Sequence, residues 1–289
     1  MTRTFTPARP IWCAGCGDFG VQSALVNALD HLGIAAHDVM VLAGIGCSGT
    51  LQNNISNYGY HAMHGRVLPT ATGVVLANPD LTVIATGGDG DGYAIGGGHL
   101  VHTFKRNPSM VYMVMNNGTY GLTKGQDSPT VEQHRNDHVE QAIDAVALGL
   151  SIPGSSFIAR AFTRWPDHMQ ELVVAALEHA REKRGFAFLE IMSPCVTYND
   201  TYPLWEAILD NLDDDPDYDP SDRAAAFGRS IELASKGRLA SGLIYQGEGA
   251  TMDAAWRHDR FEAPALQDID PARHAKSYAK IMASYAVRK

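Results

Sequence analysis

Short apolar segments alternate with helix-like segments through the first two thirds of the chain, and this alternation is the feature that most constrains the fold. Candidate strands occur at residues 39–43, 81–86, 110–115, 157–162 and 186–191. Helical patterns occur at residues 21–32, 94–106 and 167–183. Apolar strands separated by helices are typical of a parallel sheet. We therefore predict an α/β fold with a doubly wound, mainly parallel sheet, whose functional groups gather at the carboxyl ends of the strands.

The character of the sequence changes after about residue 200. An acidic segment with two prolines at residues 212–221 is more typical of a linker than of a core. The remainder, to residue 289, contains helical stretches without a strong motif. We expect residues 1–200 to form one domain and residues 201–289 to form a C-terminal extension.

Charge and hydropathy exclude several classes of protein. The chain has 23 Lys and Arg against 32 Asp and Glu and no basic cluster, so we expect no binding to nucleic acid. No run of eighteen apolar residues predicts a membrane span, and the first ten residues lack the apolar run of a secretory signal. We expect a cytoplasmic protein, in which cysteines serve more often as metal ligands or redox groups than in disulfides.

Two glycine-rich segments with polar turns lie at the ends of candidate strands, at Gly87–Tyr93 and at Met115–Gly121. Adjacent parallel strands would bring these turns side by side. Glycines let a backbone approach a phosphate, and a helix N-terminus supplies N–H donors. Asp89 would repel a bare diphosphate, but a bridging Mg²⁺ removes this conflict. The Asp89 carboxylate, the Asn117 side chain and the Thr119 carbonyl are suitable oxygen ligands.

Two other interpretations of these turns compete with a magnesium diphosphate site. A dinucleotide-binding fold would show a G-x-G-x-x-G fingerprint, but Ile95 stands where the last glycine belongs. Either turn alone is also compatible with an ordinary tight turn. Their joint occurrence after two successive strands favours the diphosphate site.

The four cysteines form one C-x₂-C pair, Cys13 and Cys16, and two single positions, Cys47 and Cys195. Four thiolates suit a zinc ion or an iron–sulfur cubane. Zinc ribbons normally contain two C-x₂-C pairs, and this chain has one. A thioredoxin-like redox pair would leave Cys47 and Cys195 unexplained, although these two could be inert buried thiols. Cys47 follows a candidate strand and should lie at the same sheet edge as Asp89.

The Gly-Asp-Gly turn followed by Asn-Asn resembles the motif of thiamine diphosphate enzymes, with Asp89, Asn117 and Thr119 matching the family's metal ligands. A longer series of motifs is similar to the β subunit of 2-oxoacid:ferredoxin oxidoreductases. These motifs occur in the family's order, at Trp12–Gly17, Gly46–Gly49, His64–Arg66, Gly88–Asp91, Arg106–Asn107, Asn117, Tyr120–Thr130 and Ser193–Cys195.

The resemblance implies thiamine diphosphate with Mg²⁺, and a [4Fe-4S] cluster bound by Cys13, Cys16, Cys47 and Cys195. It implies oxidative decarboxylation of a 2-oxoacid with coenzyme A, with electrons passing through the cluster to ferredoxin. The cofactor-binding residues would be Gly46, Ser48, His64, Gly88, Asp89, Gly90, Asp91, Asn117, Thr119, Tyr120, Gly121, Leu122 and Thr123. His64 and Lys124 are candidate catalytic or substrate contacts, with ordinary loop hydrogen bonding and a solvated surface lysine as the alternatives.

Thiamine enzymes generally take an activating glutamate from a second domain, and residues 201–289 show no second α/β unit. The resemblance therefore implies an α subunit as partner, an (αβ)₂ assembly, and packing of the C-terminal extension on that partner. We favour 2-oxoglutarate as substrate because Lys124 could pair with a distal carboxylate; pyruvate or broad specificity is the alternative. A non-oxidative thiamine-dependent decarboxylase subunit and a zinc-stabilised, non-catalytic interaction subunit also remain open.

Overall fold

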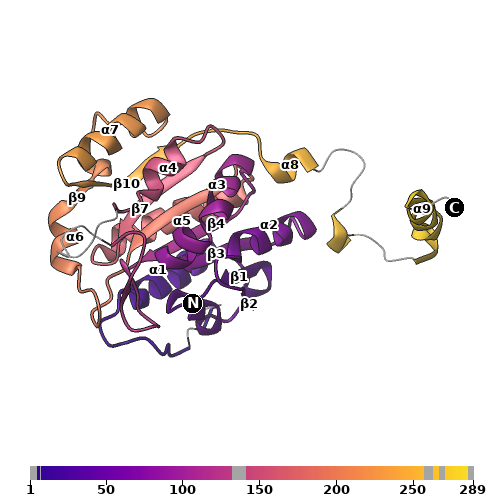
Figure 1. Cartoon of the computed structure of the whole chain (residues 1–289), viewed down its shortest axis with the longest axis horizontal. Coiled ribbons are helices and arrows are strands. Elements are labelled where there is room, and N and C mark those ends of the chain that lie inside the picture. Colours follow the sequence, from indigo (N-terminus) through magenta and orange to yellow (C-terminus); the bar gives the residue numbers. More distant parts are fainter. Residues whose placement is uncertain (1–4, 7, 132–140, 257–262, 267–270, 286–289) are drawn as a thin grey trace.

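The computed structural model describes residues 5–6, 8–131, 141–256, 263–266 and 271–285, and Figure 1 shows their arrangement. Within these residues the chain forms one large sheet, with strands β1 (Val39–Ala43), β2 (Tyr58–His61), β3 (Thr82–Gly88), β4 (Val111–Asn116), β7 (Phe157–Phe162), β8 (Ala187–Met192), β9 (Leu209–Asn211) and β10 (Leu239–Gln246). A separate short hairpin consists of β5 (Thr119–Tyr120) and β6 (Gln126–Asp127).

The order of strands in the large sheet is β2-β1-β3-β4-β8-β7-β10-β9. Neighbouring strands from β2 to β7 run parallel, whereas β10 runs antiparallel to β7 and parallel to β9. The predicted α/β fold with a mainly parallel sheet is therefore confirmed.

Helices lie on both faces of the sheet (Figure 1). They are α1 (Asp18–His31), α2 (Val67–Ala77), α3 (Gly97–Arg106), α4 (Ala145–Leu150), α5 (Pro166–Arg181), α6 (Tyr202–Ile208), α7 (Arg223–Ser235), α8 (Met252–Trp256) and α9 (Pro271–Ser284). A π-helical turn, η3 (Gly90–Ile95), precedes α3, and a 3₁₀ segment, η2 (Ser48–Asn54), follows Cys47. None of the described helices is both long and apolar enough to cross a membrane.

Two hydrophobic cores lie on opposite faces of the sheet. Along β4, Val111 and Met113 belong to the core under α1 and α5, whereas Tyr112 and Val114 belong to the core under α2, α3, α4 and α7. This alternation follows from the two-residue period of a strand. Burial on both faces explains why the strand sequences are apolar throughout.

Several elements differ from the sequence-based expectations. The helix predicted at 94–106 begins as α3 only at Gly97, because Gly90–Ile95 forms the π-helical turn. The acidic segment at 212–221 is not a free linker: Leu212 is buried, and the Tyr218 hydroxyl donates to the carbonyl of Ile244 in β10 at 2.5 Å.

Residues after 200 contribute to the same sheet. β9 and β10 extend it beyond β7, so residues 209–246 are continuous with the unit built by residues 39–192. The described side chains of α9, at residues 272 and 275–284, are exposed. The expected packing of residues 201–289 on a partner subunit stays a prediction.

Candidate cofactor site

Four adjacent parallel strands end at one edge of the sheet. In the register, Ala43 of β1 pairs with Thr86 of β3, Gly88 of β3 with Met115 of β4, and Asn116 of β4 with Met192 of β8. The segments that follow β1, β3, β4 and β8 carry, in spatial order, Cys47, Asp89, Asn117 and Cys195. The two glycine-rich turns are therefore neighbours, and Cys47 shares their edge, as the sequence predicted.

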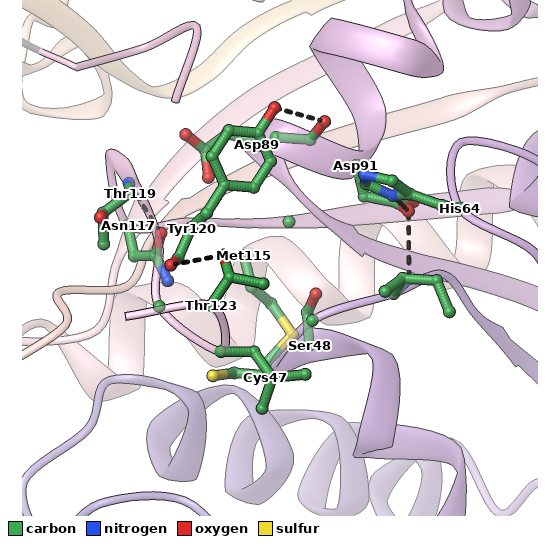
Figure 2. A pocket seen from close by; sticks show the side chains of 16 residues that line it. Cys47, Ser48, His64, Asp89, Asp91, Met115, Asn117, Thr119, Tyr120 and Thr123 are labelled. Atoms are coloured by element: carbon green, nitrogen blue, oxygen red, sulfur yellow. Dashed lines mark hydrogen bonds and ion pairs between the residues drawn. The ribbon is translucent and has the colours of Figure 1, made fainter. Parts of the chain in front are cut away.

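A pocket of about 160 Å³ opens between these strand ends. All thirteen residues that the resemblance assigned to cofactor binding line it, together with Ile45, Cys47 and Met115. Figure 2 shows His64 and Asp91 on one side of this pocket, Asn117 and Thr119 on the other, and Cys47 and Ser48 along its base.

Asp89 is a buried carboxylate held by neutral donors. Asp89 is only 1% exposed, and its Oδ2 accepts hydrogen bonds from the hydroxyl groups of Ser128 and Thr130. Burial raises the pKa of Asp89, and the two hydroxyl donors oppose this shift in part. A divalent cation beside this carboxylate would favour its charged form, so the residue fits the role of a magnesium ligand.

Asn117 and Thr119 lie in a tight turn directly after β4. Asn117 Oδ1 accepts from the Thr119 N–H at 3.0 Å, and Gly118 has a φ of 65° that favours glycine. The Thr119 carbonyl accepts from the Gly121 N–H at 3.1 Å and keeps a second lone pair. Hydrogen bonds within the turn therefore hold both proposed oxygen ligands.

Asp91 ties two loops to its own helical turn at the other side of the pocket. Its Oδ1 accepts from the backbone N–H groups of Ile45 (3.0 Å) and Gly65 (2.9 Å) and lies 2.6 Å from His64 Nδ1. A Cβ atom on Gly44 would lie 2.0 Å from Asp91 Oδ2, so only glycine fits there. The His64 side chain is 40% exposed at the rim of the pocket.

Lys124, the second candidate for a catalytic or substrate contact, does not line this pocket. It lies on an exposed turn with a φ of 77°, one residue beyond the lining residue Thr123. Its contact with substrate or coenzyme A stays a prediction.

All four cysteines are free thiols, and two hydrogen bonds to backbone carbonyls draw their segments together. Trp12 Nε1 donates to the carbonyl of Cys47 at 2.9 Å, and the Gly17 N–H donates to the carbonyl of Pro194 at 3.1 Å. The C-x₂-C loop between these two anchors is thereby attached to both of the other cysteine segments.

The thiols are also close enough to influence one another electrostatically. Burial raises the pKa of Cys47 to about 11, with further contributions from Asp18, Cys195 and Cys13. Burial likewise raises the pKa of Cys16, and Asp18, Cys47 and Cys195 add to that effect. Bound iron ions would lower the pKa values of these thiols, because they stabilise the thiolates. Within the described part of the chain no three His, Cys, Asp or Glu side chains, those of the four cysteines included, are grouped to hold a metal ion.

Gly121 forms a wall shared by the cysteine segments and the pocket. A Cβ atom built on it would lie 3.6 Å from the sulfur atoms of both Cys47 and Cys195, and 3.9 Å from Asn117 Nδ2. Two of the proposed cluster ligands and one proposed magnesium ligand therefore surround a single residue.

Sequence reasoning missed several polar residues around the site. Asp18 is buried, accepts from Ser193 Oγ at 2.6 Å, and has its pKa raised by burial to about 6. Ser128 and Thr130 contact Asp89. Both hydroxyl residues fall within the Tyr120–Thr130 motif, which was a usable signal. Asp18 directly follows the C-x₂-C-G motif, but nothing in its own position distinguishes it from an ordinary first-turn acidic residue of a helix.

Comparison with known proteins agrees with this architecture. The fold and the pocket define a thiamine pyrophosphate-binding domain: residues 39–191 match the family described as "Thiamine pyrophosphate enzyme, C-terminal TPP binding domain". Residues 195–258 match the family that describes the C-terminal part of the pyruvate ferredoxin oxidoreductase β subunit. More particularly, the chain belongs to the family of 2-oxoacid:ferredoxin oxidoreductase β subunits.

Its similarity to individual members extends over nearly the whole chain. It is 36% identical over 288 residues to a 2-oxoacid:ferredoxin oxidoreductase subunit beta of Sulfolobus sp, covering 93% of this chain and 92% of that one. It is 41% identical over 251 residues to subunit beta of 2-oxoacid:ferredoxin oxidoreductase 1 of Aeropyrum pernix, covering 81% and 77% of the two chains. Among solved structures, 2-oxoglutarate:ferredoxin oxidoreductase from Magnetococcus marinus, with 2-oxoglutarate, coenzyme A and succinyl-CoA bound, matches with a TM-score of 0.81 and 34% identity over 97% of this chain and 94% of that chain.

Proposed function

We propose that this chain binds thiamine diphosphate, Mg²⁺ and one [4Fe-4S] cluster, and that together with an α subunit it oxidatively decarboxylates a 2-oxoacid, with 2-oxoglutarate preferred. Coenzyme A accepts the acyl group, and ferredoxin accepts the electrons. The observation that carries this proposal is the shared wall at Gly121, where Cys47, Cys195 and Asn117 meet. A chain built this way holds the organic cofactor and the electron acceptor next to one another.

Asp89, Asn117 and Thr119 form the end of the pocket that binds the diphosphate. Their carboxylate, amide and carbonyl oxygens hold Mg²⁺, while the backbone at Gly88 and Gly90 approaches the phosphate groups. Gly90 has no room for a side chain, because a Cβ atom there would lie 2.2 Å from the Tyr120 ring. When bound, thiamine diphosphate supplies the carbon nucleophile and the electron sink of the decarboxylation.

Among the described histidines, His64 is the one that lines the pocket, where it can carry a proton. Asp91 Oδ1 lies 2.6 Å from its Nδ1, so a hydrogen on Nδ1 points at Asp91 and leaves Nε2 free to accept a proton. The three hydrogen bonds to Asp91 fix the ring relative to the pocket. We assign His64 to proton handling or substrate contact at the pocket rim, and Lys124 to a contact made on its exposed turn.

The four cysteines hold the cluster, which supplies a one-electron acceptor. Cys195 is buried and Cys13 is exposed, so the four thiolates would hold a cluster between the pocket and the surface of this chain. Trp12 and Gly17, through their bonds to the Cys47 and Pro194 carbonyls, keep the C-x₂-C loop in place.

The partner and substrate assignments rest on relatives. The Sulfolobus and Aeropyrum proteins carry the designation subunit beta, which supports an α subunit as partner, and we propose an (αβ)₂ assembly in the cytoplasm. The Magnetococcus marinus structure contains 2-oxoglutarate, coenzyme A and succinyl-CoA. Its 34% identity to this chain supports 2-oxoglutarate over pyruvate as the preferred substrate.

A panel of 2-oxoacids tests this function. The complex with its α subunit, purified anaerobically, is assayed with coenzyme A and a viologen acceptor. We expect viologen reduction that requires both coenzyme A and the 2-oxoacid, with the highest kcat/KM for 2-oxoglutarate. A higher kcat/KM for pyruvate would contradict the substrate assignment. Release of CO₂ without viologen reduction would favour a non-oxidative decarboxylase, and zinc in place of iron would favour an interaction subunit.

A further inference from the structure

Glu190 lies in the middle of β8, one strand away from the magnesium-binding turn, in an otherwise apolar segment. It is 2% exposed and has no contact with the pocket described above. Burying a carboxylate in the centre of a sheet is costly unless hydrogen bonds and a cation compensate for lost hydration. Its partners show why a carboxylate is placed there.

One oxygen of Glu190 joins the two arms of the proposed diphosphate site. Oε1 accepts from the Tyr93 hydroxyl at 2.8 Å and from Asn116 Nδ2 at 3.0 Å. Tyr93 belongs to η3, the helical turn that opens directly after Asp89. Asn116 ends β4 and directly precedes Asn117.

Asn116 connects Glu190 by hydrogen bonds to the residues around the proposed metal ligands. Its Oδ1 accepts from the Gly118 N–H at 3.1 Å, inside the turn that carries Asn117 and Thr119. The same Oδ1 lies 2.8 Å from Thr130 Oγ1, which is also hydrogen-bonded to Asp89 Oδ2. The orientation of one amide thus affects both proposed side-chain ligands of Mg²⁺.

The other oxygen of Glu190 is held by a buried cation. Arg160, in the neighbouring strand β7 and 3% exposed, donates from Nε to Glu190 Oε2 at 2.6 Å. Its remaining nitrogens donate to Asp144 Oδ1 and to the carbonyl of Ala240, both at 2.8 Å. Arg160 therefore fixes the carboxylate plane of Glu190, which in turn fixes Tyr93 and Asn116. Fully bonded buried networks of this kind rigidify their surroundings.

We infer that Glu190 is a positioning residue for magnesium diphosphate binding: it sets the separation of the Gly88–Asp91 turn and the Asn116–Thr119 turn. This inference rests on the proposed function, because it concerns the same site. It predicts that a change confined to Glu190 weakens cofactor binding even though Glu190 touches neither the metal nor the phosphate.

Glu190→Gln tests the inference, because it keeps the size of the side chain and turns one acceptor into a donor. If the new NH₂ faces Arg160, it meets a cation; if it faces Asn116, it meets the Asn116 NH₂ group. Turning the Asn116 amide to avoid that clash removes the acceptor for the Gly118 N–H and places its NH₂ group beside Thr130. Tyr93→Phe is the milder variant, because it removes one donor and leaves the Glu190–Asn116 bond in place.

Tyr218→Phe is the matched control. The Tyr218 hydroxyl donates one hydrogen bond to the carbonyl of Ile244 in β10, so the variant deletes an equivalent hydrogen-bonded hydroxyl outside the network. Thiamine diphosphate binding is measured by calorimetry on the α–β complex after removal of the cofactor, at a series of Mg²⁺ concentrations. The melting temperature of each cofactor-free complex is recorded in parallel.

We expect Glu190→Gln to raise the Mg²⁺ concentration for half-maximal cofactor binding about tenfold or more, Tyr93→Phe about threefold, and Tyr218→Phe not at all. A purely structural role would lower the melting temperature and leave the Mg²⁺ requirement within a factor of about two of wild type, which would overturn the inference. If Glu190→Gln does not assemble, Tyr93→Phe is compared with Tyr218→Phe, and equal Mg²⁺ requirements in these two variants would overturn the inference. Failure of the wild-type complex to bind thiamine diphosphate with Mg²⁺ would instead overturn the proposed function.

Discussion

The sulfur atoms of Cys47 and Cys195 face the same point, each 3.6 Å from where a Cβ atom would lie on Gly121. Cys47 follows β1 and Cys195 follows β8, and two other strands separate β1 from β8 in the sheet. The turns after those intervening strands, β3 and β4, carry Asp89 and Asn117. The two proposed cofactor sites are consequently built from one continuous set of strand ends.

Replacing Cys47 or Cys195 by serine should abolish the cluster. Serine is a poor iron ligand in a site built from thiolates. We expect iron and acid-labile sulfide to fall close to zero in both variants, while thiamine diphosphate is still bound through Asp89 and Asn117, which other turns supply. Undiminished iron content in the Cys195→Ser complex would show that this residue is not a ligand.

Gly17→Ala should detach the C-x₂-C loop from β8. A Cβ atom at Gly17 would lie 2.6 Å from Ser193 Oγ and 2.8 Å from the Ser193 backbone, so the loop must shift. We expect a loss of about 1–3 kcal/mol in the free energy of unfolding, and lower iron content. Denaturant unfolding and iron analysis measure the two effects.

Gly73→Ala is the control for that change. Gly73 lies on an exposed face of α2, and a Cβ atom there would meet nothing within 4 Å. Alanine in a helix interior should stabilise the chain by roughly 0.5–1 kcal/mol and leave iron content unchanged. Equal iron content in the two glycine variants would show that the position of the loop does not depend on Gly17.

Asp89→Asn should have opposite effects on stability and on cofactor binding. Burial raises the pKa of Asp89, because the charged carboxylate is unfavourable in this environment. An asparagine at this position carries no charge, so the cofactor-free fold loses this destabilising contribution. We expect the free energy of unfolding without cofactor to rise by on the order of 1 kcal/mol. Affinity for thiamine diphosphate with Mg²⁺ should fall roughly 100-fold, because a charged metal ligand is lost. Calorimetry showing unaltered affinity would remove Asp89 from the metal site.

His179 should make stability depend on pH below neutrality. It is buried, its Nε2 lies 2.9 Å from Ser156 Oγ, and burial together with the nearby Arg184 lowers its pKa to about 4. The folded chain therefore holds His179 neutral, whereas the unfolded chain binds a proton near pH 6.5. The stability that neutral His179 contributes is fully present above about pH 6.5 and is lost as the pH falls from about 6.5 to about 4.

The matched variant His179→Gln keeps a polar side chain and cannot take up this proton. Between about pH 7 and pH 4 wild type should lose on the order of 2 kcal/mol more in the free energy of unfolding than this variant. Denaturant titrations at several pH values measure the difference, and parallel pH profiles for the two proteins would contradict the assignment.

The sequence was informative where local pattern and local structure agree. β1 and β7 have the predicted bounds, because each is a short apolar run bordered by polar or turn-forming residues. The pocket residues were also predictable, since each follows a strand of the parallel sheet directly or lies in a recognisable motif.

Long-range pairing accounts for what the sequence did not reveal. β10 was missed because Ser241 and Gly242 interrupt its apolar pattern, and β2 because all four of its residues are exposed. Glu190 and Arg160 lie within apolar strands and could not be paired without knowing that β7 and β8 are neighbours. Lys124 has a positive φ and lies outside the pocket lining, and its position in the sequence alone does not fix where such a turn places a side chain.

A single-turnover experiment tests most directly the claim that the organic cofactor and the cluster exchange electrons within one chain. The anaerobic α–β complex is mixed with one equivalent of 2-oxoglutarate, without ferredoxin, and both CO₂ and the electron paramagnetic resonance spectrum are recorded. We predict CO₂ release accompanied by the signals of an organic radical and of a reduced [4Fe-4S] cluster, both lost in Asp89→Asn. Release of CO₂ while the cluster stays oxidised would contradict the account.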